Sequence, residues 1–317
     1  MDRIIDVLAA HNSFVISSHA RPDADSVGSQ LALAWALRTL GKTFQIVNHD
    51  APPSYLGFLP GIDWVEVSDA ATGFDAKVAI ILECNSLLRT EVDGLDRDIV
   101  INIDHHAGNE MYGTYNWHDE TAAACTEQIY NVINELGVPI SYEIGSALYA
   151  GILTDTGSFR HANITEHTFK ICQEVAAAGV NVAQLAADIY HNSSIGKIKL
   201  TGTLLENMRL EAGNQIAILH LSDDLLARTN CPQDDLEGLI NIPLTAKTVQ
   251  AVVMIKPQQE LTRVSLRSKT MLNVRAIAAS FGGGGHRNAA GFSSPIAADD
   301  IEKQVVNKLR NALDGIS

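Results

Sequence analysis

The first half of the chain alternates short apolar runs with longer segments of helical periodicity. Nearly continuous apolar runs predict buried strands, whereas apolar residues that repeat every three to four positions predict helices. Because strands without polar alternation are typical of parallel sheets covered on both faces, the pattern predicts an α/β unit with a mostly parallel sheet. The predicted strands are 14–18, 43–48, 78–82 and 99–103, and the predicted helices are 4–11, 24–40, 122–136, 143–153 and 167–178.

The pattern changes in the second half. Residues 182–208 are mostly helical in period, with an interruption at 191–194. Mixed strands and helices after this bridge predict a smaller α/β or α+β domain. The sequence thus predicts a first domain over 1–185, a helical linker over 186–208 and a second domain over 209–317. The second domain's predicted strands are 215–221, 248–256 and 260–268, and its predicted helices are 224–229, 274–281 and 301–313.

Acidic residues and histidines follow the predicted strands of the first half. In an open α/β sheet, ligands bind outside the carboxyl ends of the strands, so we expect these side chains to form one site. A further carboxylate ends the helical stretch that reaches residue 153. The clusters are His19 with Asp23 and Asp25, Glu83, Asp104 with His105 and His106, and Asp155.

One imidazole and two carboxylates within seven residues suit a divalent metal with mixed nitrogen and oxygen preference, such as manganese. The alternative is an ordinary helix start in which Asp23 or Asp25 is the N-cap. A cap explains one aspartate, but not His19 and both aspartates together.

Composition narrows the function. The chain has 317 residues, is 46% hydrophobic and carries a formal net charge of -14, which is enough for two domains with separate cores. The acidic balance argues against a protein that coats long nucleic acid, but it is compatible with a short nucleotide held in a local basic pocket. The four cysteines are far apart and are expected to be buried thiols. Without a signal-peptide pattern or an apolar run long enough for a bilayer, we expect a cytoplasmic protein with no membrane contact.

Four stretches carry a family resemblance. The segments 19–29, 104–106 and 151–156 resemble three of the four motifs of the DHH phosphoesterase superfamily. The segment 282–291 resembles the glycine-rich signature of its DHHA1 substrate domain. The length and two-domain layout are most similar to the NrnA-type group, whose members are oligoribonucleases (nanoRNases) that also dephosphorylate 3′-phosphoadenosine 5′-phosphate (PAP).

The resemblance implies a site with two divalent ions, expected to be Mn²⁺. It places His19 and Asp23 on one ion. It places Asp25, His105 and Asp155 on the other, and a motif II aspartate, at the position of Glu83 here, between them. In the family pattern, Asp104 supports the histidines, and His106 lies beside the substrate phosphate as a hydrogen-bond donor or general acid.

Glu83 departs from that pattern, because its side chain is one methylene longer than the usual aspartate. The site could relax around it, the activity or metal preference could change, or the second ion could be weak or lost. Glu83 could also be an acidic residue that follows the strand by coincidence.

The glycine run predicts a loop whose backbone N–H groups approach a phosphate, with Gly284, Gly285 and His286 as substrate-binding residues. In the strand before it, Arg263, Ser265 and Arg267 alternate and therefore share one face. That face either binds substrate or is simply solvated. Arg89, soon after Glu83, is a further candidate for binding phosphate.

We therefore expect a metal-dependent phosphoric ester hydrolase that acts on short RNA or PAP. One alternative is a phosphodiesterase for linear or cyclic dinucleotides such as pApA. An alternative of another class is a nucleotide-binding protein whose catalysis is weakened by Glu83. The family resemblance also suggests a homodimer, and we expect no binding of long duplex nucleic acid.

Overall fold

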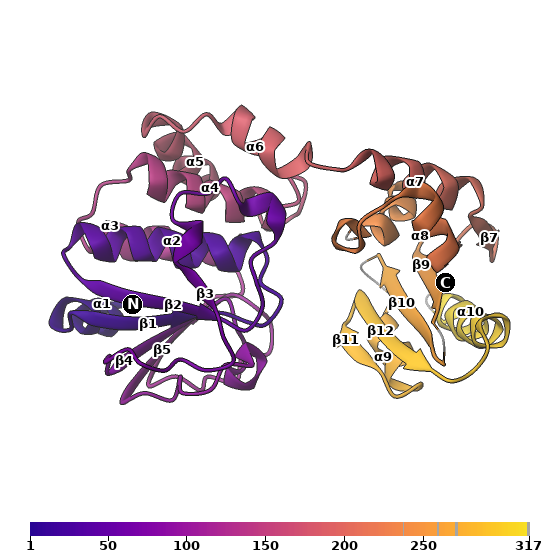
Figure 1. Cartoon of the computed structure of the whole chain (residues 1–317), viewed down its shortest axis with the longest axis horizontal. Coiled ribbons are helices and arrows are strands. Elements are labelled where there is room, and N and C mark those ends of the chain that lie inside the picture. Colours follow the sequence, from indigo (N-terminus) through magenta and orange to yellow (C-terminus); the bar gives the residue numbers. More distant parts are fainter. Residues whose placement is uncertain (237, 259, 270–271, 316–317) are drawn as a thin grey trace. The chain divides into compact units, whose positions relative to one another are not determined.

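The computed structural model describes residues 1–236, 238–258, 260–269 and 272–315, except for the side chains of Asp234 and His286. The chain divides into two compact units, Met1–Asn192 and Ser193–Ser317 (Figure 1). The boundary falls inside the segment 186–208 that the sequence predicts as a helical linker. Each unit has its own sheet and core.

The first unit is built on a parallel sheet, as predicted. Six strands within the described residues pair in the order β3-β2-β1-β4-β5-β6, and each pairing is parallel. The strands are β1 (Ser13–Ser17), β2 (Thr43–Asn48), β3 (Val65–Val67), β4 (Val78–Leu82), β5 (Ile99–Asp104) and β6 (Tyr115–His118). The helices are α1 (Asp2–Ala10), α2 (Ala24–Thr39), α3 (Cys125–Glu135), α4 (Tyr142–Asp155), α5 (Glu166–Ala177) and α6 (Val182–Tyr190).

The central strands are buried on both faces, which explains their unbroken apolar sequences. Phe14 and Ile80 point into the larger core with α2 and α4. Val15 and Ile81 point the opposite way, into a smaller cluster. Because successive side chains of a strand alternate between faces, both faces need apolar residues. The order of the strands places the carboxyl ends of β1, β4 and β5 side by side.

The second unit contains a mixed sheet in the order β11-β12-β10-β9-β8-β7. Apolar clusters cover both of its faces, one with α9 and α10 and the other with α7. The strands are β7 (Arg209–Glu211), β8 (Ile216–His220), β9 (Ala251–Pro257), β10 (Thr262–Ser268), β11 (Gly284–His286) and β12 (Ala289–Ser294). The helices are α7 (Ile195–Glu206), α8 (Asp223–Thr229), α9 (Val274–Ala279) and α10 (Ala298–Asp314).

The glycine run is not the open loop that the sequence predicts. Residues Gly284–His286 form β11, which pairs antiparallel with β12. A Cβ on Gly285, whose φ is +129°, would lie 2.5 Å from the carbonyl oxygen of Ala289. Glycine therefore lets the two strands approach closely, and this part of the run has a packing role.

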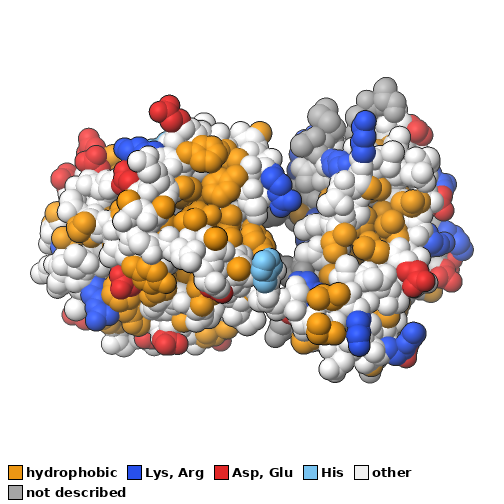
Figure 2. Space-filling model, turned by 90° about the horizontal axis from the view of Figure 1, so that it is seen from above, with side chains coloured by type: hydrophobic (Ala, Val, Ile, Leu, Met, Phe, Trp, Pro, Cys, Tyr) orange, Lys and Arg blue, Asp and Glu red, His pale blue; other side chains and the backbone are white. Residues whose placement is uncertain are grey.

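Part of the surface of the first unit is apolar. Figure 2 shows hydrophobic side chains gathered on the face of the first unit that is seen from above. Among the exposed large hydrophobic residues of this unit are Phe169 on α5 and Tyr190 on α6. Phe169 stacks on Phe159 with ring centroids 5.8 Å apart.

No helix in the described part of the chain is both long and apolar enough to span a bilayer.

Candidate metal centre

The candidate ligands of the first unit meet at the carboxyl edge of its sheet. Three groups bring one ligand atom from each member within 4.8 Å of one another. Glu83 belongs to two of these groups, and His105 also belongs to two, so the groups form one continuous cluster. The groups are His19 with Asp23 and Glu83, Asp25 with His105 and Asp155, and Glu83 with His105 and His106.

Asp23 combines the two interpretations that its sequence allows. It is the N-cap of α2, and its Oδ1 accepts hydrogen bonds from the backbone N–H groups of Asp25 and Ser26. Its Oδ2 lies 4.0 Å from Nε2 of His19. A helix cap and a cluster ligand can therefore be the same side chain, because each role needs one oxygen.

Backbone carbonyls fix which nitrogen each histidine offers. A carbonyl can only accept, so a ring nitrogen bonded to it carries the proton. Nδ1 of His19 donates to the carbonyl of Ala20 at 2.9 Å, and Nδ1 of His105 donates to that of Ala122 at 3.2 Å. The Nε2 atoms of both histidines then face the carboxylates with a lone pair when the ring is neutral. This is the arrangement in which a histidine binds a metal ion.

Glu83 lies at the centre of the cluster. Its side chain is 1% exposed, and its backbone has a left-handed φ of 55°, a conformation that is uncommon outside glycine and is often found at functional sites. Oε2 is 2.7 Å from Nε2 of His19, and Oε1 is 3.3 Å from Nε2 of His105. The longer side chain thus presents one oxygen to each histidine.

The ionisable groups of the cluster shift one another's pKa values. Burial would raise the pKa of Glu83, but hydrogen bonds from His105 and His19 outweigh it and lower this pKa to about 2. Burial would lower the histidine pKa values, yet Glu83 raises that of His19 to about 9. Glu83, with the charges of Asp25 and Asp155, raises that of His105 to about 10. Burial and the charge of Asp25 raise the pKa of Asp155 to about 8. The cluster therefore holds protons that a cation would displace.

Asp104 supports His106 by direct contact. It is the last residue of β5 and fully buried, and its Oδ1 lies 2.9 Å from Nδ1 of His106. Its Oδ2 accepts a 2.6 Å hydrogen bond from Asn109, which also donates to Asn102. Asn109 was not among the residues that the sequence pattern singles out. Its signal is its place five residues after Asp104, in a polar turn that follows the strand.

The candidate substrate residues lie on several elements. Arg263, Ser265 and Arg267 alternate along β10 with buried residues, and so they share the less buried face, as predicted. Gly284 and Gly285 lie on β11, and the side chain of His286 lies outside the described residues. Arg89 of the first unit donates to Oδ1 of Asn85 at 2.9 Å, and its carbonyl accepts from the N–H of Ala20.

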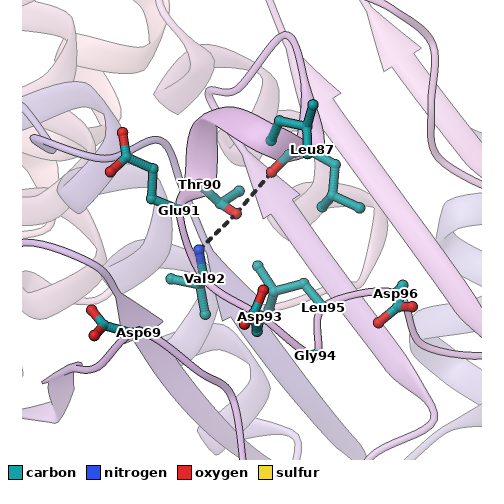
Figure 3. A pocket seen from close by; sticks show the side chains of 10 residues that line it. Asp69, Leu87, Thr90, Glu91, Val92, Asp93, Gly94, Leu95 and Asp96 are labelled. Carbon is teal, nitrogen blue, oxygen red and sulfur yellow. Dashed lines mark hydrogen bonds between the residues drawn. The ribbon is translucent and has the colours of Figure 1, made fainter.

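A separate pocket of the first unit is not suited to phosphate. It is an open hollow of about 400 Å³ beside the segment that follows β4 (Figure 3). Thr90 links the backbones of Leu87 and Val92 at its wall. Its described lining contains four carboxylates and no lysine or arginine, so it would repel an anion. The four carboxylates are Asp69, Glu91, Asp93 and Asp96.

Comparisons with known proteins agree with this architecture. The sequence model of the DHH family's N-terminal domain matches residues 13–152, and that of the DHHA1 domain matches residues 213–315. A Thermus thermophilus protein named bifunctional oligoribonuclease and PAP phosphatase NrnA is 31% identical over 319 residues, covering 99% of this chain and 94% of the relative.

Solved structures with a similar fold cover nearly all of this chain. An exopolyphosphatase-related protein from Bacteroides fragilis has a TM-score of 0.91 and 26% identity, covering 99% of this chain and 97% of that one. RecJ from Thermus thermophilus, solved with Mn²⁺, has a TM-score of 0.52 and 12% identity, covering 98% of this chain and 54% of that one, and so shares the fold. From its two matched domains and its full-length relatives, the chain belongs to the DHH–DHHA1 family.

Proposed function

We propose that the chain is a metal-dependent phosphoesterase that hydrolyses short oligoribonucleotides and removes the 3′-phosphate of PAP. The observation that carries this proposal is the continuous cluster of carboxylates and imidazoles that meets around Glu83. The full-length relative named oligoribonuclease and PAP phosphatase supports the choice of substrates. The possible homodimer and the cytoplasmic location remain predictions.

The residues fit a pair of divalent ions. His19, Asp23 and Glu83 would hold one ion, and Asp25, His105 and Asp155 the other, with one oxygen of Glu83 toward each. Oε2 of Glu83 is buried and lies 2.7 Å from Nε2 of His19, whose raised pKa keeps a proton between the two atoms in the metal-free protein. A cation would satisfy both lone pairs. The mixed nitrogen and oxygen donors favour Mn²⁺ over Mg²⁺, because Mg²⁺ prefers oxygen ligands alone.

When bound, such ions neutralise charge on the phosphoryl oxygens and lower the pKa of an attacking water. The chain itself would orient the phosphate and supply a proton. We assign the role of proton donor to His106. Nδ1 of His106 lies 2.9 Å from Oδ1 of Asp104, and this contact raises the pKa of His106 although burial acts to lower it. A protonated imidazole in this position can donate to the phosphate or to the leaving oxygen.

The second unit would bind the rest of the nucleotide. Arg263 and Arg267 place guanidinium groups on one face of β10, with Ser265 between them, and guanidinium matches phosphate in geometry and charge. We propose the same role for Gly284, Gly285 and His286 on β11, and for Arg89 in the first unit.

The test is release of phosphate and mononucleotide in the presence of Mn²⁺. The substrates are PAP, pApA and an RNA ladder of two to five nucleotides. An Asp104→Ala/His105→Ala double variant should be inactive, whereas His167→Ala, which changes a histidine outside the cluster, should retain activity. The relative rates on PAP, pApA and longer RNA choose among the substrates.

Turnover in the double variant, or none in the wild type with any divalent ion, would contradict the proposal. Nucleotide binding without turnover would favour a weakened, binding-only protein. Activity gained in Glu83→Asp would then identify Glu83 as the cause.

A further inference from the structure

Asp25 is held by a helix other than its own. It lies in the first turn of α2, but its side chain caps the start of α3, which has no side-chain cap from its own N-cap residue, Ala124. Oδ2 of Asp25 accepts from the N–H of Cys125 at 2.6 Å. Oδ1 accepts from both the N–H and the hydroxyl of Thr126, at 2.9 and 2.7 Å. A buried carboxylate thus receives three hydrogen bonds from one helix turn.

These bonds decide which oxygen faces the cluster. The N–H and hydroxyl groups of Thr126 both donate to Oδ1 of Asp25, so the lone pairs of this oxygen are directed toward α3. Oδ2 has one backbone donor and lies 3.7 Å from Nε2 of His105. The carboxylate is therefore held in a rotation that presents Oδ2, rather than both oxygens, to the group that also contains Asp155.

Gly151 makes room for the pair. A Cβ on Gly151 of α4 would lie 2.5 Å from Oδ1 of Asp25, 2.5 Å from the methyl carbon of Thr126 and 2.6 Å from its hydroxyl oxygen. Glycine within a helix is less favourable than alanine, so this position gives up helix stability for the close fit. Gly28 of α2 has a different main role, because a Cβ there would lie 2.5 Å from the carbonyl oxygen of Ala147 on α4, and 3.2 Å from the methyl carbon of Thr126. The threonine therefore has its methyl against Gly151 and its hydroxyl on Asp25.

We propose that Thr126 is a positioning residue, whose hydroxyl fixes Asp25 so that Oδ2 alone is offered to a divalent cation bound by Asp25, His105 and Asp155. The inference rests on the proposed function, because it gives this threonine a role at the same site. A positioning role differs from a packing role in one respect, because it requires the hydroxyl of Thr126 and not only the shape of the side chain.

Two substitutions separate these roles. Thr126→Val keeps the methyl and the branched shape but removes the hydroxyl donor. Thr126→Ser keeps the donor and removes the methyl. Thr168→Val is a matched control, because this buried threonine donates its hydroxyl to Glu127, a carboxylate of α3 outside the cluster.

The experiment is a titration of metal-free protein with Mn²⁺ alone, followed by calorimetry and by the electron paramagnetic resonance signal of free Mn²⁺. Loss of a side chain that orients a metal ligand weakens binding by about 10–100-fold. We expect this loss in Thr126→Val for one of two ions, because the group of His19, Asp23 and Glu83 does not contain Asp25. Thr126→Ser and Thr168→Val should bind both ions as the wild type does.

The outcomes are distinct. Unchanged Mn²⁺ binding in Thr126→Val would overturn the inference and leave the proposed function intact. An equal loss in Thr126→Val, Thr126→Ser and Thr168→Val would show that only packing matters, and it would overturn the inference as well. A wild type that binds no Mn²⁺ would refute the proposed function and the inference with it.

Discussion

Neutralising two carboxylates of the cluster should change the stability of the metal-free protein in opposite directions. Glu83→Gln removes the negative charge that the surrounding histidines stabilise, so it should lower the melting temperature at pH 7. Asp155→Asn replaces a carboxylate whose ionised form is disfavoured by burial and by the charge of Asp25, so it should raise the melting temperature. Both changes should abolish Mn²⁺-dependent hydrolysis, because both remove a proposed ligand.

The magnitude for Glu83 follows from its pKa. A fall from 4.5 to about 2 corresponds to about 3 kcal/mol in favour of the ionised form, at 1.36 kcal/mol per pKa unit. Because the folded-state pKa is lowered, this stability is present above pH 4.5 and is lost as the pH falls through 2. For a unit of this size 1 kcal/mol shifts the melting temperature by about 2–4 °C. We therefore expect Glu83→Gln to melt about 6–12 °C below the wild type at pH 7.

The sign for Asp155 is opposite. Its folded-state pKa is raised from 3.8 to about 8, so ionisation costs stability above pH 3.8, and the cost grows until pH 8. The assay is scanning calorimetry of both variants in chelator, at pH 7 and again below pH 4.5. At the lower pH both differences from the wild type should shrink. A higher melting temperature for Glu83→Gln, or shifts of the same sign in both variants at pH 7, would refute the reasoning.

Three further predictions concern the cluster and the second unit. Because the pKa values of His19 and His105 are raised to about 9 and 10, Mn²⁺ binding at pH 7 should release protons. Calorimetry in buffers of different ionisation enthalpy measures this release, and buffer-independent heats would contradict it. Asn109→Ala removes a 2.6 Å hydrogen bond to Asp104 and should lower kcat about 10-fold with Mn²⁺ affinity unchanged, as oriented acid groups contribute at least that much. Equal losses of kcat and of Mn²⁺ affinity would contradict this prediction and indicate a general disruption of the site. Arg267→Ala should raise KM for PAP but leave hydrolysis of bis-p-nitrophenyl phosphate, which has no nucleoside, as in the wild type; equal effects on both substrates would contradict a role in nucleotide binding.

The fold could be predicted where the chain has apolar runs. Strand β4 has the predicted bounds, 78–82, because each of its five residues is buried. Strand β6 (Tyr115–His118) escaped prediction, since its four residues are half-buried and show no apolar run. Strand β11 escaped because a glycine run has no hydrophobic pattern at all, and only its pairing with β12 makes it a strand.

The site could be predicted only as a set of residue types at strand ends. Parallel strands bring their carboxyl ends together whatever the loops do, so His19, Glu83 and His105 had to lie near one another. The contacts that orient them come from distant parts of the chain and leave no local pattern. Thr126 lies 101 residues from Asp25. The left-handed backbone of Glu83, which aims its longer side chain, is likewise invisible in a sequence where glutamate simply follows a strand.

The spacing of the two aspartates in the first motif now has a physical explanation. Asp23 gives one oxygen to the start of α2 and the other to the side of His19. Asp25 caps the start of α3 while its Oδ2 faces His105. Each carboxylate therefore uses part of its hydrogen-bonding capacity on a helix N-terminus, whose partial positive charge favours the ionised form. These bonds offset part of the cost of burying negative charge. They also link the geometry of the cluster to the packing of α2 on α3, so that a change at the start of either helix should alter the positions of the proposed metal ligands.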